Sequence, residues 1–180
     1  MKSNQNLKNN ICFCLDASGS MSSLKDDVIK VFNQQIENLI EKSKANEQET
    51  RVSVFTFADT VQNICWDSDV LRAPSIEKFY RVGGMTSMID AVTAAINDLK
   101  KIPEIHSDFS HLLICLSDGQ NNINNHLASK LRTLIAGLPN NWTVAFLGPD
   151  KDAIDQAISY GFERGNCQIW STTSKGVLDV

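Results

Sequence analysis

The sequence predicts an α/β fold, a three-layer sandwich with helices on both faces of a mostly parallel central sheet. Short apolar runs typical of strands alternate with longer stretches in which apolar residues recur at helical spacing. One pair of strand-like runs is separated only by a turn, which indicates a hairpin and one antiparallel edge. Alternating strands and helices favour a parallel sheet covered on both faces. At 180 residues, the chain has the size of one domain with a single core.

The strands are predicted from apolar and β-forming runs. Residues 11–16 are apolar up to an aspartate, which ends the first strand. Residues 51–57 and 61–66 are rich in β-formers and flank the turn-prone Ala58-Asp59-Thr60, so they form the predicted hairpin. The remaining strands are predicted at residues 112–116, 143–147 and 167–170.

Four segments show the amphipathic pattern of helices. In the first, Leu24, Val28 and Phe32 begin an apolar stripe with charged residues on the opposite side. Prolines follow the second and third segments, as expected after helix ends. The last opens with Asp150 and Asp152, whose carboxylates suit a helix N-terminus. The predicted helices cover residues 24–40, 87–99, 127–138 and 150–158, and a short helix or surface loop is expected at 75–80.

The first strand leads into a group of oxygen-bearing side chains. Asp16 ends the apolar run, and Ser18 and Ser20 follow at two-residue spacing. Mg²⁺ takes about six oxygen ligands, commonly one or two carboxylates plus waters and a ligand from outside. We therefore expect these three side chains to contribute to a metal site at the edge of the sheet.

Two later segments bring further oxygens to the same edge. A glycine pair precedes Thr86 and Ser87 at the start of a helical pattern, and the strand at 112–116 runs into Ser117-Asp118-Gly119. Ligands of open parallel sheets bind outside the carboxyl ends of the strands. Thr86 and Asp118 are therefore expected to join the first loop, with Ser87 competing with Thr86 as the ligand.

Asp16-x-Ser18-x-Ser20, then Thr86, then Asp118 in Ser-Asp-Gly, closely resembles the metal-ion-dependent adhesion site of the von Willebrand factor A domain family. The resemblance covers almost the whole chain. It implies a Rossmann-like sandwich with six strands in the order 3-2-1-4-5-6, strand 3 being antiparallel. It also implies that Ser18, Ser20 and Thr86 ligate the metal directly, that Asp16 and Asp118 act mostly through waters, and that one position is left for a partner's Asp or Glu.

The motifs look like those of compact intracellular members of this family from bacteria and their phages. Such members often work with a partner, such as a companion ATPase, in complex assembly or regulation. The expected domain spans residues 11–180 after a polar tail at 1–10. Family members usually close with a full helix, whereas residues 173–180 hold barely one turn. We expect a fragment of a longer protein, with a reduced closing helix as the alternative.

Composition narrows the range of partners and locations. The net charge of −4 and the lack of a basic stripe argue against nucleic acid as the main partner. No apolar run approaches the roughly 18 residues of a membrane span, and the N-terminus lacks the apolar core of a secretory signal, so a cytoplasmic location is expected. Five cysteines without zinc-like spacing are expected to be buried and reduced.

Simpler structural roles compete with the metal assignment. Asp16 and Asp118 could cap turns or helices, and Thr86 could be the N-cap of the helix that follows it. Gly119 could simply permit a positive backbone angle. The three histidines, at positions 106, 111 and 126, have no spacing that pairs them and are expected at the surface.

The sequence thus predicts a non-enzymatic module that binds Mg²⁺, with Mn²⁺ as a substitute, and through it an acidic residue of a protein partner. The alternative is a Mg²⁺-dependent phosphohydrolase, or another small-ligand enzyme, that uses the same metal site. Such an enzyme needs a positioned base and cationic groups to neutralise a phosphate. The candidate loops contain no Lys, Arg or His beside the ligands, which favours the interaction module.

Overall fold

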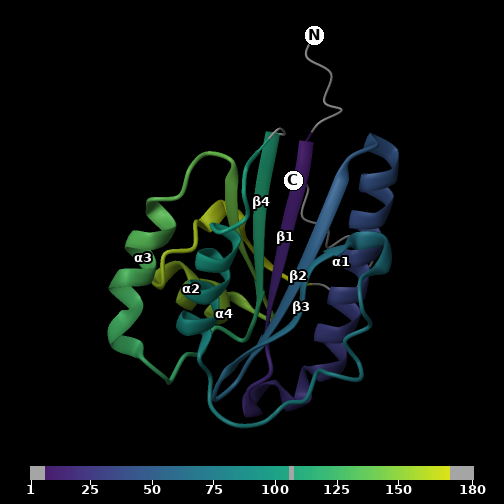
Figure 1. Ribbon diagram of the computed structural model, residues 1–180. Helices are drawn as coiled ribbons and strands as arrows, with labels where there is room; N and C mark the ends of the chain where they lie inside the picture. Colours follow the sequence, from purple (N-terminus) through teal and green to yellow (C-terminus); the bar gives the residue numbers. More distant parts are fainter. Residues whose placement is uncertain (1–6, 106–107, 171–180) are drawn as a thin grey trace.

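In the computed structural model, which describes residues 7–105 and 108–170, the strands form one six-stranded sheet in the order β3-β2-β1-β4-β5-β6 (Figure 1). Neighbouring strands are parallel except β2 and β3, which are antiparallel. The predicted topology is therefore confirmed. The strands are β1 (Leu7–Asp16), β2 (Glu49–Phe57), β3 (Val61–Asp69), β4 (Asp108–Leu116), β5 (Trp142–Gly148) and β6 (Cys167–Ile169).

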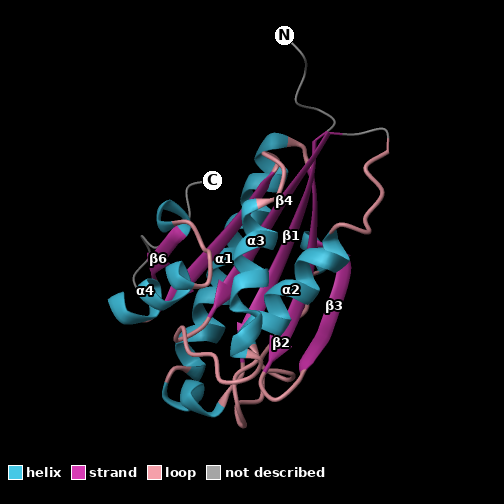
Figure 2. Cartoon of the chain, turned by 90° about the vertical axis from the view of Figure 1, so that its left-hand side faces the viewer, coloured by secondary structure: helices cyan, strands magenta, loops and turns pink. Residues whose placement is uncertain are grey.

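Helices cover both faces of the sheet. The long helix α1 lies on one face, and α2, α3 and α4 lie on the other, as Figures 1 and 2 show from two sides. No helix in the described parts of the chain is long and apolar enough to cross a membrane. The helices are α1 (Lys25–Asn46), α2 (Met88–Leu99), α3 (Ala128–Ala136) and α4 (Lys151–Ser159).

Strand β1 illustrates how the two cores form. Its alternate residues point to opposite faces, so Phe13 packs in the core under α1 while Cys12 and Cys14 pack in the core under α2. Phe13 meets Phe32 of α1 edge to face, with ring centroids 5.0 Å apart. A central strand buried on both faces has no polar side, which explains the continuous apolar run in the sequence.

The structure differs from the sequence predictions at several element ends. Strand β1 begins at Leu7, because residues 8–10, predicted as tail, pair with both β2 and β4, and Leu7 pairs with β4. At residues 75–80, where a short helix or a surface loop was expected, the chain forms turns, and the side chains of Ile76 and Tyr80 are buried. A single 3-10 turn, Val70–Arg72, precedes them. The tail at residues 1–6 and the closing helix at 173–180 fall outside the described residues.

Two residue classes are less uniform than predicted. All five cysteines are free, but Cys65 and Cys167 are only half-buried, because they lie on the edge strands β3 and β6. The prediction for His111 is wrong: it is buried, stacks on Trp142 at 4.3 Å, and its Nε2 lies 2.8 Å from Glu104 Oε1. His126 is exposed as predicted, and His106 falls outside the described residues.

Candidate metal site

The candidate residues lie on three loops at the carboxyl edge of the sheet. Asp16 is the last residue of β1, and Asp118 follows the end of β4 by two residues. β1 and β4 are adjacent parallel strands, so their carboxyl ends lie side by side. The turn between β2 and β3 and the loop before α2 join them there, through hydrogen bonds described below.

Asp16 is fully buried and both of its carboxylate oxygens accept hydrogen bonds. Oδ1 accepts from the Ser18 backbone N–H at 2.9 Å, and Oδ2 accepts from Ser117 Oγ at 2.5 Å. The hydroxyl of Tyr80, also buried, donates to the backbone carbonyl of Asp16. The carboxylate is therefore held in one orientation by β4 and by its own turn.

Ser18 and Ser20 present their hydroxyls together. Their Oγ atoms are 3.1 Å apart, with Ser18 buried and Ser20 exposed. The intervening Gly19 donates its N–H to Gly84 O at 3.0 Å, which ties this loop to the one that carries Thr86. The Asp-x-Ser-x-Ser segment therefore places two neighbouring hydroxyl oxygens, one buried and one exposed, beside a buried carboxylate.

The loop before α2 buries both of its hydroxyl residues. Thr86 and Ser87 are almost fully buried, and Ser87 Oγ has no hydrogen-bond partner. Ser87 is the N-cap position of α2, yet its side chain makes no capping bond. The predicted alternative, that Thr86 is the N-cap, is therefore wrong, and the structure does not use either hydroxyl as a helix cap.

The loop is shaped by Gly84 and its neighbour Asp59. Gly84 has φ +80°, and a Cβ added there would lie 2.4 Å from Asp59 Oδ2. Asp59 Oδ1 accepts from the Met85 backbone N–H at 2.9 Å. Glycine is needed at this position both for its backbone angle and for the close approach of the carboxylate.

Asp118 is partly exposed and its Oδ1 accepts from the Gln120 backbone N–H at 3.0 Å. Gly119 has φ +84°, as the sequence suggested, and a Cβ there would meet the Ala153 backbone at 2.8 Å. The turn-forming roles considered for Asp16 and Asp118 are thus present. Both turns use the Oδ1 atom of the aspartate. Oδ2 of Asp16 is engaged by Ser117, whereas Oδ2 of Asp118 is available to water or a cation.

The electrostatics of the edge favour a cation. Burial raises the pKa of Asp16 from 3.8 to about 6, although hydrogen bonds from Ser117 and Ser18 oppose the rise, and the nearby charge of Asp118 adds to it. The loop residues 17–24, 58–60, 83–87 and 117–124 include no Lys, Arg or His. Buried carboxylate charge without a cationic side chain is the condition that a bound cation relieves.

The donor chemistry fits Mg²⁺. All five candidate side chains offer oxygen, the ligand type that Mg²⁺ and Mn²⁺ prefer. Among the described residues, no three His, Cys, Asp or Glu side chains are grouped so as to hold a metal ion. A cation at this edge would rely on neutral hydroxyls and waters as well as two carboxylates, which predicts weak binding without a further anionic ligand.

Several residues that support the edge were not predicted. Ser117, Tyr80 and Asp59 each fix a candidate residue or its loop. Asn122 accepts a hydrogen bond from the Thr86 N–H before α2, and Asn121 accepts one from the Ile89 N–H in the first turn of α2. Ser117 is the first residue of the Ser-Asp-Gly motif, so this motif could have indicated its role beside Asp16. The others have no local pattern, because their partners are distant in the sequence.

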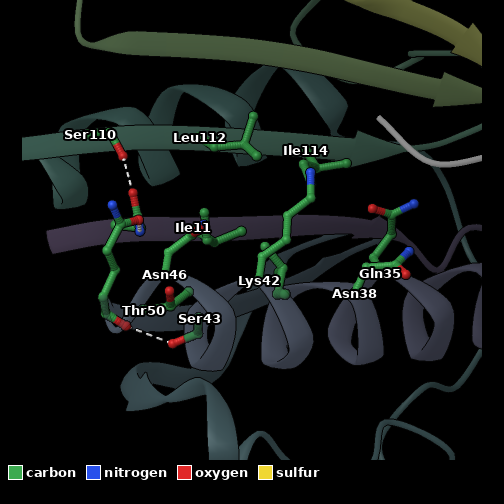
Figure 3. Close-up of a pocket in the computed structure, with 13 residues that line it drawn as sticks. Ile11, Gln35, Asn38, Lys42, Ser43, Asn46, Thr50, Ser110, Leu112 and Ile114 are labelled. Carbon is green, nitrogen blue, oxygen red and sulfur yellow. Dashed lines mark hydrogen bonds between the residues drawn. The ribbon is translucent and has the colours of Figure 1, made fainter. Parts of the chain in front are cut away.

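The cavity shown in Figure 3 lies elsewhere. It has a volume of about 160 Å³ and lies between the C-terminal half of α1 and the amino-terminal parts of β1 and β4. At its end, Asn9 accepts from Ser110 Oγ at 2.7 Å, and Ile11 and Leu112 line its floor. None of the candidate residues Asp16, Ser18, Ser20, Thr86 and Asp118 lines this cavity, so it is distinct from the candidate metal site.

Comparison with known proteins identifies the family. The von Willebrand factor type A domain profile matches residues 10–159, so the chain belongs to this family. Domains of the family are generally protein-interaction modules. No curated protein matches the chain significantly in sequence.

Solved structures share the fold at low sequence identity. A von Willebrand factor type A protein from Catenulispora acidiphila has a TM-score of 0.64 and 15% identity, covering 91% of this chain and 39% of its own. Proximal thread matrix protein 1 from the mussel byssus has a TM-score of 0.60 and 21% sequence identity, and the match covers 92% of this chain and 42% of that protein. The type V pili tip protein Mfa5 from Porphyromonas gingivalis has a TM-score of 0.54 and 14% sequence identity, and the match covers 64% of this chain and 20% of that structure. The chain thus spans less than half the length of each, and the likeness shows the fold alone.

Proposed function

We propose that this chain is a metal-dependent protein-interaction module that binds Mg²⁺ through Asp16, Ser18, Ser20, Thr86 and Asp118. The observation that carries the proposal is the buried Asp16 carboxylate, surrounded by hydroxyl oxygens and loops without a cationic side chain. A partner protein would contribute an Asp or Glu to the remaining coordination position. A companion ATPase is one class of partner that the family resemblance suggests.

The residues divide into two roles in this proposal. Ser18, Ser20 and Thr86 would ligate through neutral oxygens, whereas Asp16 and Asp118 would act mostly through waters. Asp16 already accepts two hydrogen bonds, so its oxygens are better oriented to hold a water than to swing toward a metal. Neutral direct ligands leave a bound Mg²⁺ strongly electrophilic, so that it attracts an anionic side chain from outside.

The proposal places the interaction in the cytoplasm. The five free cysteines are typical of a compartment in which thiols stay reduced. The mild net charge of −4 gives no support for nucleic acid as a competing partner.

The phosphohydrolase alternative has less support. Phosphate chemistry needs cationic side chains to stabilise charge and a base to activate water. The segments 17–24, 58–60, 83–87 and 117–124 of the candidate site contain no Lys, Arg or His, and none of the candidate residues lines the cavity of Figure 3.

A pull-down tests the proposed function. The immobilised protein is incubated with lysate of the native host in Mg²⁺ or in EDTA, and bound proteins are identified by mass spectrometry. Asp118→Ala is run in parallel with Glu41→Ala, which removes the same charge from an exposed position on α1. The proposal expects a partner that the parent and Glu41→Ala retain only in Mg²⁺, and that Asp118→Ala does not retain.

The result also separates the alternatives. A partner retained equally in Mg²⁺ and EDTA would contradict the metal-dependent mechanism. Metal-dependent hydrolysis of a generic phosphomonoester by the parent, abolished by Asp118→Ala, would favour the enzyme instead.

A further inference from the structure

The backbone of Thr86 is held by the loop that follows Asp118. The Thr86 N–H donates to Asn122 Oδ1 at 2.7 Å, and the Thr86 carbonyl accepts from the backbone N–H groups of Asn122 and Ile123 at 3.1 and 3.2 Å. These bonds belong to neither a helix nor a strand pairing. Both peptide groups of Thr86 are therefore fixed by a segment 36 residues away.

The neighbouring Asn121 holds the start of α2 in the same way. Its Oδ1 accepts from the Ile89 N–H at 3.0 Å, and its Nδ2 donates to the Ile123 carbonyl and to Asn125 Oδ1, both at 2.6 Å. The first N–H groups of a helix lack intrahelical partners and usually need a nearby cap. Here a side chain from another loop supplies it, which leaves the hydroxyls of Thr86 and Ser87 without a capping role.

We infer that Asn122 is a positioning residue for the metal site, which orients the Thr86 hydroxyl by fixing the Thr86 backbone. This inference rests on the proposed function. Asn122 Oδ1 is engaged with the Thr86 N–H, so the side chain acts on Thr86 and not as a ligand itself. Its bonds join the two loops that carry Thr86 and Asp118, so these two candidate ligands hold a constant relative position.

The exposure of Asn122 separates positioning from stability. Its side chain lies at the surface, where water can replace a lost hydrogen bond, so truncation should alter the fold little. The Thr86 peptide, in contrast, would lose the only side-chain acceptor described for its N–H. A rotation of this peptide moves the Thr86 hydroxyl relative to the hydroxyls of Ser18 and Ser20.

The test titrates the whole chain with Mn²⁺, a paramagnetic ion, and measures the broadening of backbone amide signals by NMR. Asn122→Ala removes the acceptor, and Asn122→Asp retains it with an added charge. Gln120→Ala and Gln120→Glu are matched controls for truncation and for charge, since Gln120 is exposed on the same loop and no side-chain hydrogen bond is described for it. Hydrogen exchange of the Thr86 amide reports whether the bond itself is broken.

The expected result for the parent is Mn²⁺-dependent broadening at Ser18, Thr86 and Asp118. Asn122→Ala should weaken Mn²⁺ binding by about threefold to tenfold, speed exchange at Thr86 and reduce its broadening relative to Ser18, while both Gln120 variants keep the parent pattern. Asn122→Asp should restore the broadening at Thr86.

Two outcomes would overturn the inference in distinguishable ways. Parent-like Mn²⁺ affinity and broadening in Asn122→Ala, together with rapid exchange at Thr86, would show that Thr86 is positioned without Asn122, and the proposed function would stand. A parent without any Mn²⁺-dependent broadening at this edge would remove the proposed metal site, and the inference with it.

Discussion

Ser117 Oγ donates a 2.5 Å hydrogen bond to Oδ2 of Asp16, a residue 101 positions away in the sequence. Both residues are fully buried, and the same Ser117 hydroxyl accepts from the Gly119 N–H at 3.1 Å. This contact joins the carboxyl ends of β1 and β4 and holds a charged group in place under the loops.

Removing this hydroxyl should destabilise the protein. Ser117→Ala deletes a buried hydrogen bond to a carboxylate, and such bonds contribute about 1.5–3 kcal/mol to the free energy of unfolding. Urea unfolding at pH 7.5 measures the change. Ser159→Ala, at an exposed site where the described hydroxyl bond is a local one to the Gln156 carbonyl, should change stability by less than about 0.5 kcal/mol. Equal effects of the two substitutions would contradict the role given to Ser117.

The stability of the metal-free protein should depend on the ionisation of Asp16. Burial raises the pKa of this carboxyl from 3.8 to about 6 in the folded state. The folded state therefore holds the Asp16 proton more tightly than the unfolded state does. Protonated Asp16 therefore contributes to the free energy of unfolding fully below about pH 4, and this contribution is lost as the pH rises through 6. Between pH 4 and pH 7.5 the free energy of unfolding should fall by about 3 kcal/mol on this account.

Asp16→Asn isolates this contribution from the other titrating groups. In EDTA the variant should be more stable than the parent at pH 7.5, and the advantage should shrink toward pH 4. Urea unfolding of both proteins across this range measures it. The idea fails if parent and variant show the same dependence of stability on pH.

Substitutions at the candidate ligands should separate binding from folding. The free energies of unfolding of Thr86→Ala and Asp118→Ala should lie within about 1 kcal/mol of the parent value. The described bonds of Thr86 are made by its backbone, which the substitution keeps, and the Asp118 side chain bonds only the Gln120 N–H in its own turn. Both should lose the partner that is captured only in Mg²⁺. Ser87→Ala should keep it. Loss of binding in Ser87→Ala with retention in Thr86→Ala would transfer the ligand role to Ser87, whose Oγ is buried and unpartnered.

Met85 should contribute to partner binding through its apolar side chain. It is 48% exposed, next to Thr86, in a loop held by Asp59 and Gly19. Met85→Ser should weaken Mg²⁺-dependent capture about fivefold, equivalent to ~1 kcal/mol of lost apolar burial. Leu71→Ser, at a 53% exposed site before the turns at 75–80, is the matched control. Equal binding by Met85→Ser and the parent would exclude this loop from the partner surface.

The periodic patterns of the sequence predicted the architecture well. The strand and helix segments and the antiparallel edge appear in the structure, because burial on one or two faces imposes a repeat that is visible locally. The order of the strands in the sheet was implied by the family resemblance, and the structure confirms it. Predictions failed where burial depends on neighbours. His111 is buried because Trp142 stacks on it from β5, and Cys65 is half-exposed because β3 is an edge strand.

The sequence by itself determined the strands, the helices and the Asp-x-Ser-x-Ser and Ser-Asp-Gly motifs that place oxygen atoms after β1 and β4. Only the tertiary structure decided which side chains hold those oxygens in place. Ser117 faces Asp16 because β1 and β4 pair in one register, and Asn122 reaches Thr86 because α2 begins beside the loop that follows β4. Such hydrogen bonds join residues far apart in the chain, so no local periodicity encodes them.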